Sequence, residues 1–292
     1  MITVEHLGKQ IKGKTILSDI SFTIEKGDCL AMIGPNGAGK TTLMSCLLGD
    51  KVVSQGKVLV NGKSPRSKEL RSQLAVLAQE NEIPSNLKVF ELLNFFKEIA
   101  RHPLSDEAID AYLQFTDEQK KQLAGKLSGG QKRLLSFVLC LIGQPQMLFL
   151  DEPTAGMDTS TRQRFWQIVQ SLKAKGITII YSSHYIEEVE HTAERILVLH
   201  QGKLLRDTTP FAMRTSEQEK QVTLSKDFLE AVEGLDGIYD LEVKNDTVSF
   251  MTKSIDTIWQ ELQEQGCRIS DIEVQNKTLL NTLFDNTREE DK

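Results

Sequence analysis

The residues best suited to chemistry form one glycine-rich run, "GPNGAGKTT", which starts at Gly34. The run follows a short apolar stretch, "CLAMI", and precedes a segment, "KTTLMSCLLG", whose apolar residues have helical spacing. A glycine loop between a strand and a helix can bind phosphate, because bare backbone N–H groups meet the positive end of the helix dipole there. The run therefore predicts a phosphate-binding loop made of these residues: Gly34, Pro35, Asn36, Gly37, Ala38, Gly39, Lys40, Thr41 and Thr42.

Three side chains of this loop have chemical roles in the prediction. Lys40 directs a full positive charge toward the β- and γ-phosphates of a nucleotide. Thr41 offers a hydroxyl group to Mg²⁺, and Thr42 offers a further donor to phosphate. The alternative is an ordinary glycine-rich turn between a strand and a helix. The flanking strand and helix favour the phosphate site.

A second group of reactive side chains ends the apolar run "MLFLDEP". In a protein with a phosphate-binding loop, an acid at such a strand end can hold Mg²⁺ through its water shell, and Asp151 fits this role. The next residue, Glu152, can polarise a water molecule for attack on the γ-phosphate. The alternative is a pair of acids in a polar turn, which the presence of the loop makes the weaker interpretation.

Six motifs of the chain occur in the order typical of ABC-type ATPases, and the chain resembles this family over about residues 1 to 210. The segment "LSGGQ" is similar to the family's signature motif. The other matching segments are "GPNGAGKTT", "LAQ" with Gln79, "MLFLDEP", "AGMD" with Asp158, and "SSH" with His184. The resemblance implies an enzyme that binds ATP and Mg²⁺ and hydrolyses the nucleotide.

The resemblance also implies roles for residues outside the loop. Gln79 would reach Mg²⁺ and the attacking water, so the expected metal-binding residues are Thr41, Gln79 and Asp151. His184 would contact the γ-phosphate and position both the water and Glu152. In the family two such modules pack head to tail, which implies a homomeric or heteromeric dimer formed on ATP binding. The residues that would reach the ATP held by the other subunit are Ser128, Gly129, Gly130, Gln131 and Asp158.

One position departs from the family pattern. The family commonly places an aromatic residue about two dozen positions before the loop, where its ring stacks on adenine. Ile11 stands at this adenine-contact position here. Because an aliphatic side chain stacks less well than an aromatic ring, we expect weak discrimination between ATP and GTP.

Alternating strand and helix patterns around these motifs predict an α/β protein with a P-loop NTPase core. We expect a largely parallel sheet within an ATP-binding domain over residues 1–215, with a helical subdomain at about 81–144 that carries the signature motif. Residues 216–292 lack nucleotide motifs and read as β-α-β-β-α-β, which predicts a small ferredoxin-like α+β domain. A last amphipathic helix is expected from "KTLLNTLFDNT".

Composition limits the possible partners. The net charge of −6 argues against nucleic acid as the main ligand, so we expect no nucleic-acid partner. The longest apolar stretch, "LLSFVLCLIG", is about half the ~20 residues that a membrane span needs. Any membrane role therefore has to come through a partner, a separate membrane-spanning permease subunit that would hold the chain at the cytoplasmic face of the cell membrane.

These observations favour the ATP-hydrolysing subunit of an ABC transporter, with export preferred over import because the tail "DIEVQNKTLLNTLFDNT" resembles the C-terminal extension of exporter ATPases. The alternative is a soluble ABC-type ATPase acting in translation or DNA repair. Such proteins usually carry two modules, long coiled coils or zinc-binding inserts, and none of these features is visible in the sequence. A regulator that binds ATP without hydrolysis is a third possibility, which Glu152 and His184 oppose.

Overall fold

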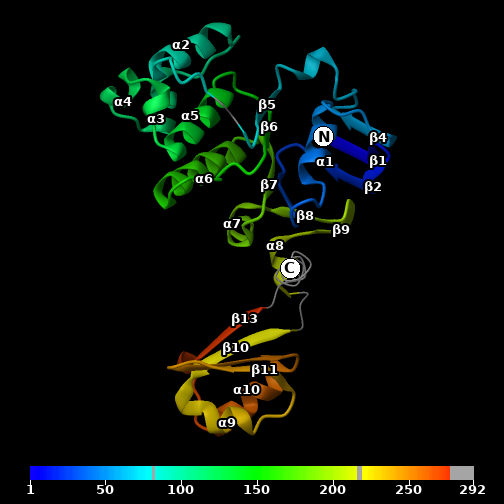
Figure 1. The fold of residues 1–292 in the computed structure, drawn as a ribbon, viewed down its shortest axis with the longest axis vertical. Coiled ribbons are helices and arrows are strands. Elements are labelled where there is room, and N and C mark those ends of the chain that lie inside the picture. The colour runs from blue at the N-terminus through cyan, green and yellow to red at the C-terminus, as the bar shows by residue number, and fades with distance from the viewer. Residues whose placement is uncertain (81–82, 216–218, 277–292) are drawn as a thin grey trace. The chain divides into compact units, whose positions relative to one another are not determined.

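The computed structural model describes residues 1–80, 83–215 and 219–276 (Figure 1). The chain divides into two compact units, Met1–Thr209 and Pro210–Lys292. The helix expected from Lys277 onward lies outside the described residues. Most of the tail that resembles the C-terminal extension of exporter ATPases also lies outside them.

A six-stranded sheet forms the centre of the first unit, in the order β5-β6-β7-β3-β8-β9. Five strands run parallel and the last is antiparallel to its neighbour β8. Their bounds are Leu74–Leu77 for β5, Met147–Leu150 for β6, Thr178–Ser183 for β7, Cys29–Ile33 for β3, Arg195–His200 for β8 and Lys203–Thr208 for β9. Strands β3, β6 and β7 are buried along their whole length, as expected for parallel strands covered on both faces. This sheet confirms the predicted α/β fold.

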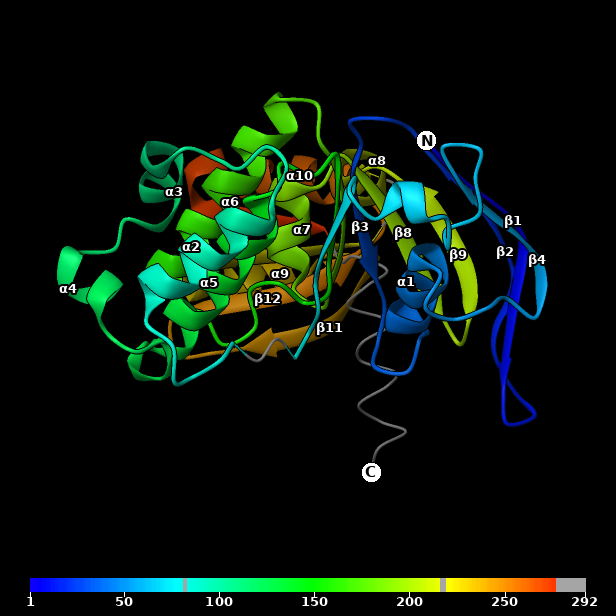
Figure 2. The same ribbon diagram turned by 90° about the horizontal axis from the view of Figure 1, so that it is seen from above.

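The helices of the first unit fall into two groups. One group follows strands of the central sheet and consists of α1 (Lys40–Leu48), α6 (Thr159–Ala174) and α7 (Ile186–Thr192). The other group gathers to one side beyond strand β5, as Figures 1 and 2 show, and consists of α2 (Val89–Ile99), α3 (Asp106–Leu113), α4 (Asp117–Lys121) and α5 (Gly129–Leu141). Helix α1 is capped at its C-terminus by Gly49, whose φ of 80° suits a left-handed helix cap.

An antiparallel sheet of three strands, in the order β2-β1-β4, lies on the opposite side of the unit from α2–α5 (Figure 2). Its strands are β1 (Ile2–Ile11), β2 (Lys14–Ile24) and β4 (Gln55–Val60). Their inward side chains share one apolar core with α1 and the central sheet, a core that includes Leu17, Leu43 and Phe149. This packing holds the start of α1 in place.

The second unit contains a four-stranded antiparallel sheet in the order β11-β12-β10-β13. The strands are β10 (Lys220–Ser225), β11 (Ile238–Val243), β12 (Thr247–Thr252) and β13 (Ile272–Asn276), and the helices are α8 (Pro210–Thr215), α9 (Leu229–Glu233) and α10 (Ile255–Glu264). After α8 the elements follow the order β-α-β-β-α-β. Val222, Phe250 and Leu262 belong to the apolar core of this unit, which is separate from the core of the first unit.

Candidate active site

Four neighbouring strands end at one edge of the central sheet and carry the reactive residues there. The glycine loop follows β3, Gln79 follows β5, Asp151 and Glu152 follow β6, and His184 follows β7. The carboxyl ends of parallel strands meet at one edge of a sheet, and ligands of α/β proteins bind outside that edge. The topology therefore brings together residues that lie far apart in the sequence.

The glycine loop adopts a backbone that only glycine can supply at two positions. A Cβ atom on Gly34 would lie 2.1 Å from the carbonyl oxygen of Leu199. Gly39 has a φ of 103° and directly precedes α1. These glycines let the loop lie close to its neighbours and lead into the N-terminus of α1, where anions bind favourably.

A cavity of about 630 Å³ opens over this loop. It is lined by Lys14, Thr15, Ile16, Asn36, Gly37, Ala38, Gly39, Lys40, Thr41, Thr42, Gln79, Glu152 and Gln201. Most of the predicted loop residues thus share one cavity with two of the residues expected to act on water.

Lys40 is the buried cation of the loop, with 7% of its surface exposed. Its Nζ donates hydrogen bonds to the carbonyl oxygens of Gly34, at 2.7 Å, and Pro35, at 3.2 Å. Burial lowers the pKa of Lys40, and the carboxylates of Glu152 and Asp151 oppose this shift. The ammonium group therefore lies between the loop and the acids, where phosphate oxygens can take over from the loop carbonyls.

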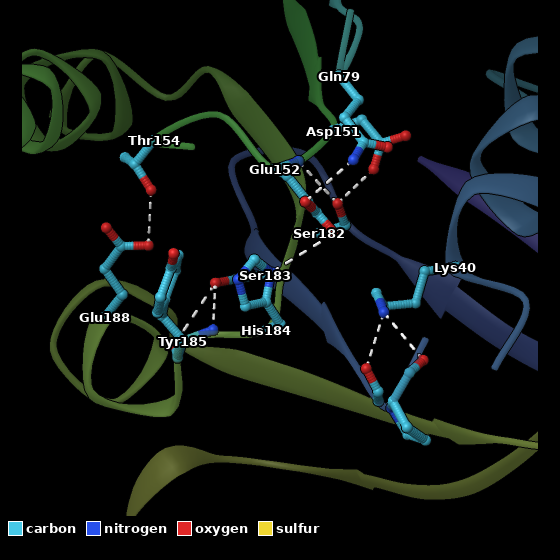
Figure 3. A network of polar contacts seen from close by, with 12 residues as sticks. Lys40, Gln79, Asp151, Glu152, Thr154, Ser182, Ser183, His184, Tyr185 and Glu188 are labelled. Carbon is cyan, nitrogen blue, oxygen red and sulfur yellow. Dashed lines mark hydrogen bonds and ion pairs between the residues drawn. The ribbon is translucent and has the colours of Figure 1, made fainter. Parts of the chain in front are cut away.

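The acids after β6 are held by a serine from the next strand (Figure 3). The Oγ of Ser182 donates a hydrogen bond of 2.5 Å to the Oδ1 of Asp151 and accepts one of 2.9 Å from the backbone N–H of Glu152. Asp151 is 6% exposed and Ser182 is fully buried. Glu152 has a φ of 44°, which is uncommon for a residue with a side chain and marks local backbone strain.

Glu152 also lies between two polar side chains from neighbouring strands (Figure 3). The Nε2 of Gln79 donates a hydrogen bond of 3.2 Å to one carboxylate oxygen of Glu152. The Nδ1 of His184 lies 3.5 Å from the other. This arrangement orients a carboxylate toward the cavity above the glycine loop, where it can accept a proton from water.

Sequence reasoning missed Arg133, a buried residue of α5 that contacts the same strand ends. Its guanidinium group donates only to backbone carbonyl oxygens in the described part of the chain. The acceptors are those of Ala78, Gln79, Asp151, Glu152 and Pro153. Burial lowers the pKa of Arg133. The available signal was a cation directly before the mostly apolar run "LLSFVLCL".

The signature motif and Asp158 lie together, away from this cavity. Ser128 caps α5, and its Oγ accepts a hydrogen bond of 3.2 Å from the backbone N–H of Gln131, whose side chain returns one to Ser128. Asp158 caps α6, and its hydrogen bonds with Ser160 and Thr161 lower its pKa. A Cβ atom on Gly130 would lie 3.2 Å from the Oδ2 of Asp158. The described residues that line the cavity include none from the signature motif and none from the Asp158 motif.

Comparison with known proteins identifies the family. A model of the ABC transporter family matches residues 17–155. Nod factor export ATP-binding protein I of Rhizobium sp. (strain N33) is 36% identical over 218 residues, which cover 73% of this chain and 72% of that protein. The protein of the same name from Burkholderia lata is 33% identical over 226 residues, 74% of this chain and 73% of that one. The chain belongs to the ABC transporter ATP-binding family.

Solved structures agree with this membership. CbiO1 of Clostridium perfringens, part of the ABC transporter complex CbiONQ, is 27% identical with a TM-score of 0.62, over 72% of this chain and 88% of that one. An ATP-binding subunit of an ABC transporter has a TM-score of 0.65 at 22% identity, over 74% of this chain and 92% of that one, and shows the fold alone. The protein is thus the ATP-binding subunit of an ABC transporter. It is an ABC-type ATPase, which binds ATP.

The adenine-contact position of this ABC ATPase lies outside the cavity lining. Ile11 is the last residue of β1 and is half-buried, whereas Lys14, Thr15 and Gln201 line the cavity. Two further findings concern the described residues. No helix there combines the length and apolarity that a membrane span requires. No cluster of three or more His, Cys, Asp or Glu side chains there could hold a metal ion by itself.

Proposed function

We propose that this ABC ATP-binding protein hydrolyses ATP to drive export through a separate membrane-spanning permease subunit. The observation that carries the proposal is the convergence of Glu152, Gln79 and His184 beside the cavity of the glycine loop. The direction of transport is supported by relatives that are named for export of Nod factors.

The loop binds the triphosphate in this proposal. Backbone N–H groups of the residues from Asn36 to Lys40 and the N-terminus of α1 surround the phosphates. Lys40 releases its hydrogen bonds to Gly34 and Pro35 and turns its ammonium group to phosphate oxygens. Catalysis then depends mostly on positioning and on charge neutralisation.

Thr41, Gln79 and Asp151 would hold Mg²⁺ at this site. Their hydroxyl, amide and carboxylate oxygens are the hard donors that Mg²⁺ prefers, and such an ion usually takes one or two carboxylates together with substrate phosphates. A site with a single carboxylate, that of Asp151, therefore fits the usual ligand set of Mg²⁺. When bound, Mg²⁺ neutralises charge on the phosphate oxygens. The hydrogen bond from Ser182 keeps the carboxylate of Asp151 in place.

Glu152 acts on the attacking water as the general base. Its carboxylate accepts the water proton, while Gln79 and His184 fix its orientation from both sides. His184 also faces the γ-phosphate in this proposal. Because Glu152 and Gln79 line the same cavity as Lys40, the proton acceptor and the phosphate site are close enough to serve one reaction.

Dimerisation completes the site. Ser128, Gly129, Gly130, Gln131 and Asp158 do not line the cavity of their own loop, so their proposed contacts with ATP need a second subunit. The N-terminus of α5 offers backbone N–H groups that suit an anion. The partner is a second copy of this chain or a related ATP-binding subunit.

The permease docks beside α2 and β5. Val76, Phe90, Phe95 and Ile99 are large apolar residues exposed in this region. A groove of about 1060 Å³ lies at the amino-terminal end of β5 beside the end of α2, and its lining is mostly polar, with Leu74 and Ile99 among its apolar residues. Exposed apolar side chains grouped on one surface are typical of protein interaction sites. Docking on these apolar side chains would hold the chain at the cytoplasmic face of the membrane, beside α2, the helix that follows Gln79 in the chain.

Co-purification tests the proposal. The tagged full chain is recovered from detergent-extracted native membranes in the presence of ATP, and its ATPase activity is measured with and without its partners. We expect a polytopic membrane protein that changes the activity. Recovery from the soluble fraction alone, bound to ribosomes or DNA, would favour the translation or repair alternative and reject transport.

A further inference from the structure

Arg133 makes an unusually complete set of hydrogen bonds. An arginine side chain carries five N–H donors in a rigid plane, and here each finds a backbone carbonyl oxygen. The Nε donates to Pro153 at 3.0 Å. The Nη1 donates to Ala78 and Gln79, and the Nη2 donates to Asp151 at 2.9 Å and Glu152 at 3.3 Å. Arg133 as a whole residue is 8% exposed. None of these five hydrogen bonds goes to a carboxylate group.

The five carbonyl groups belong to two strand ends that carry reactive residues. Ala78 and Gln79 follow β5, and Asp151, Glu152 and Pro153 follow β6. Glu152 has a left-handed backbone, with φ at 44°. A residue with a side chain keeps such a conformation only when its surroundings fix it. The carbonyl groups of Glu152 and both its neighbours are bound by the same guanidinium group, which supplies this constraint.

Arg133 reaches these strand ends from the helix that begins at the signature motif. It lies in the second turn of α5, whose N-cap is Ser128. We infer that Arg133 is a positioning residue that fixes the backbones of Glu152 and Gln79 and joins them mechanically to the signature helix. This inference rests on the role proposed above for Glu152. A shift of α5 on contact with a second subunit's ATP would be carried through Arg133 to the general base.

Lysine cannot replace arginine in this role. Its ammonium group has three tetrahedral donors at a single atom, whereas the carbonyl groups here need five donors spread over a plane. Arg133→Lys keeps the charge and leaves at least two of the five carbonyl groups without their donor. The substitution therefore separates the positioning function from a simple need for positive charge.

The test compares Arg133→Lys with Arg164→Lys in the full-length protein. Arg164 lies on α6 and its Nε donates to the carbonyl of Tyr112, so it is a matched arginine outside the site. ATP binding is titrated directly, and kcat is expressed per ATP-binding site, so that any misfolded fraction drops out. We expect Arg133→Lys to lower kcat by about 10- to 100-fold, as a displaced catalytic group does, with KM changed by less than about threefold. Arg164→Lys keeps kcat.

A double substitution shows whether Arg133 acts through Glu152. In a Glu152→Gln background, Arg133→Lys should add less than about a twofold further loss, because the two changes remove the same contribution. A wild-type kcat per site in Arg133→Lys overturns the inference, and so does an equal loss of kcat in both backgrounds. Wild-type turnover of Glu152→Gln alone would instead reject the proposed role of Glu152, which distinguishes the two failures.

Discussion

The side-chain amide of Gln79 donates a hydrogen bond of 3.2 Å to the carboxylate of Glu152, across 73 positions of sequence. The bond joins the end of β5, where the chain enters the helical region, to the proposed general base. Movement in that region can therefore reorient the carboxylate. In the function proposed above, this bond is a physical route by which a transport partner would control hydrolysis.

Glu152→Gln should bind ATP yet nearly stop turnover. Glutamine keeps the shape of the side chain but cannot accept a proton, and loss of a general base typically costs 10²- to 10⁴-fold. We expect kcat to fall at least about 100-fold in a phosphate-release assay, with ATP affinity kept and an ATP-bound dimer accumulating in size-exclusion chromatography. Glu5→Gln, at an exposed position of β1, is the control. Turnover near the wild-type level would remove Glu152 from the base role.

Lys40→Met should abolish ATP binding while making the nucleotide-free protein more stable. Burial lowers the pKa of Lys40 below its unfolded value, so at neutral pH the unfolded chain binds the proton more tightly than the folded one. The charge therefore costs stability fully at pH values below the folded pKa, and the cost falls to zero as the pH rises from the folded to the unfolded pKa. We expect a higher Tm without ligand and no Tm increase on adding MgATP.

The wild-type protein provides the reference for that experiment. At ATP concentrations of 100 times Kd, binding stabilises a protein by about 2.7 kcal/mol, which gives a readily measured Tm shift. A Lys40→Met protein that still gains this shift would contradict the assignment of the loop. A lower Tm without ligand would instead contradict the stability argument alone.

Ser182→Ala should reduce both stability and activity. The substitution removes a donor from the buried carboxylate of Asp151 and the acceptor of the Glu152 N–H. Leaving buried polar groups unpaired costs about 1–3 kcal/mol, which corresponds to roughly 2–4 °C in Tm per kcal/mol for a protein of this size. Thermal melts and ATPase assays check this. Ser171→Ala is the control, because the Ser171 hydroxyl donates to the Ile168 carbonyl within its own helix, α6, away from the acids. Equal Tm losses in both variants would contradict the prediction.

The sequence predicted those parts of the site that depend on local pattern. A strand, a glycine loop and a helix follow one another within a short stretch, so the loop around Lys40 could be placed from its own neighbours. Asp151 likewise ends a buried apolar strand. His184 had no such local signal, because a histidine at a strand end is usually structural, and only the family resemblance singled it out.

Contacts between distant segments were beyond the reach of the sequence. Arg133 is one cation in a helix, and its role depends on carbonyl groups at Ala78 and Glu152, which no side-chain pattern reveals. Ile11 failed to line the cavity for a related reason. Its neighbours in sequence form the β1–β2 turn, and the turn brings Lys14 and Thr15 to the cavity instead.

The part of the site that faces the nucleotide base should therefore discriminate weakly between ATP and GTP. Ile11 should contribute little to nucleotide binding. The cavity lining contains no aromatic side chain among the described residues, so stacking on adenine, worth about 0.5–1.5 kcal/mol for an aromatic pair, is missing. We expect KM values for GTP and ATP within about tenfold of each other, since 1.4 kcal/mol corresponds to tenfold. Ile11→Ala should leave both within about twofold, whereas Gln201→Ala, which removes a lining side chain, should raise both. A KM for ATP that rises more than about fivefold in Ile11→Ala would restore Ile11 as a base contact, because that side chain would then have to touch the nucleotide.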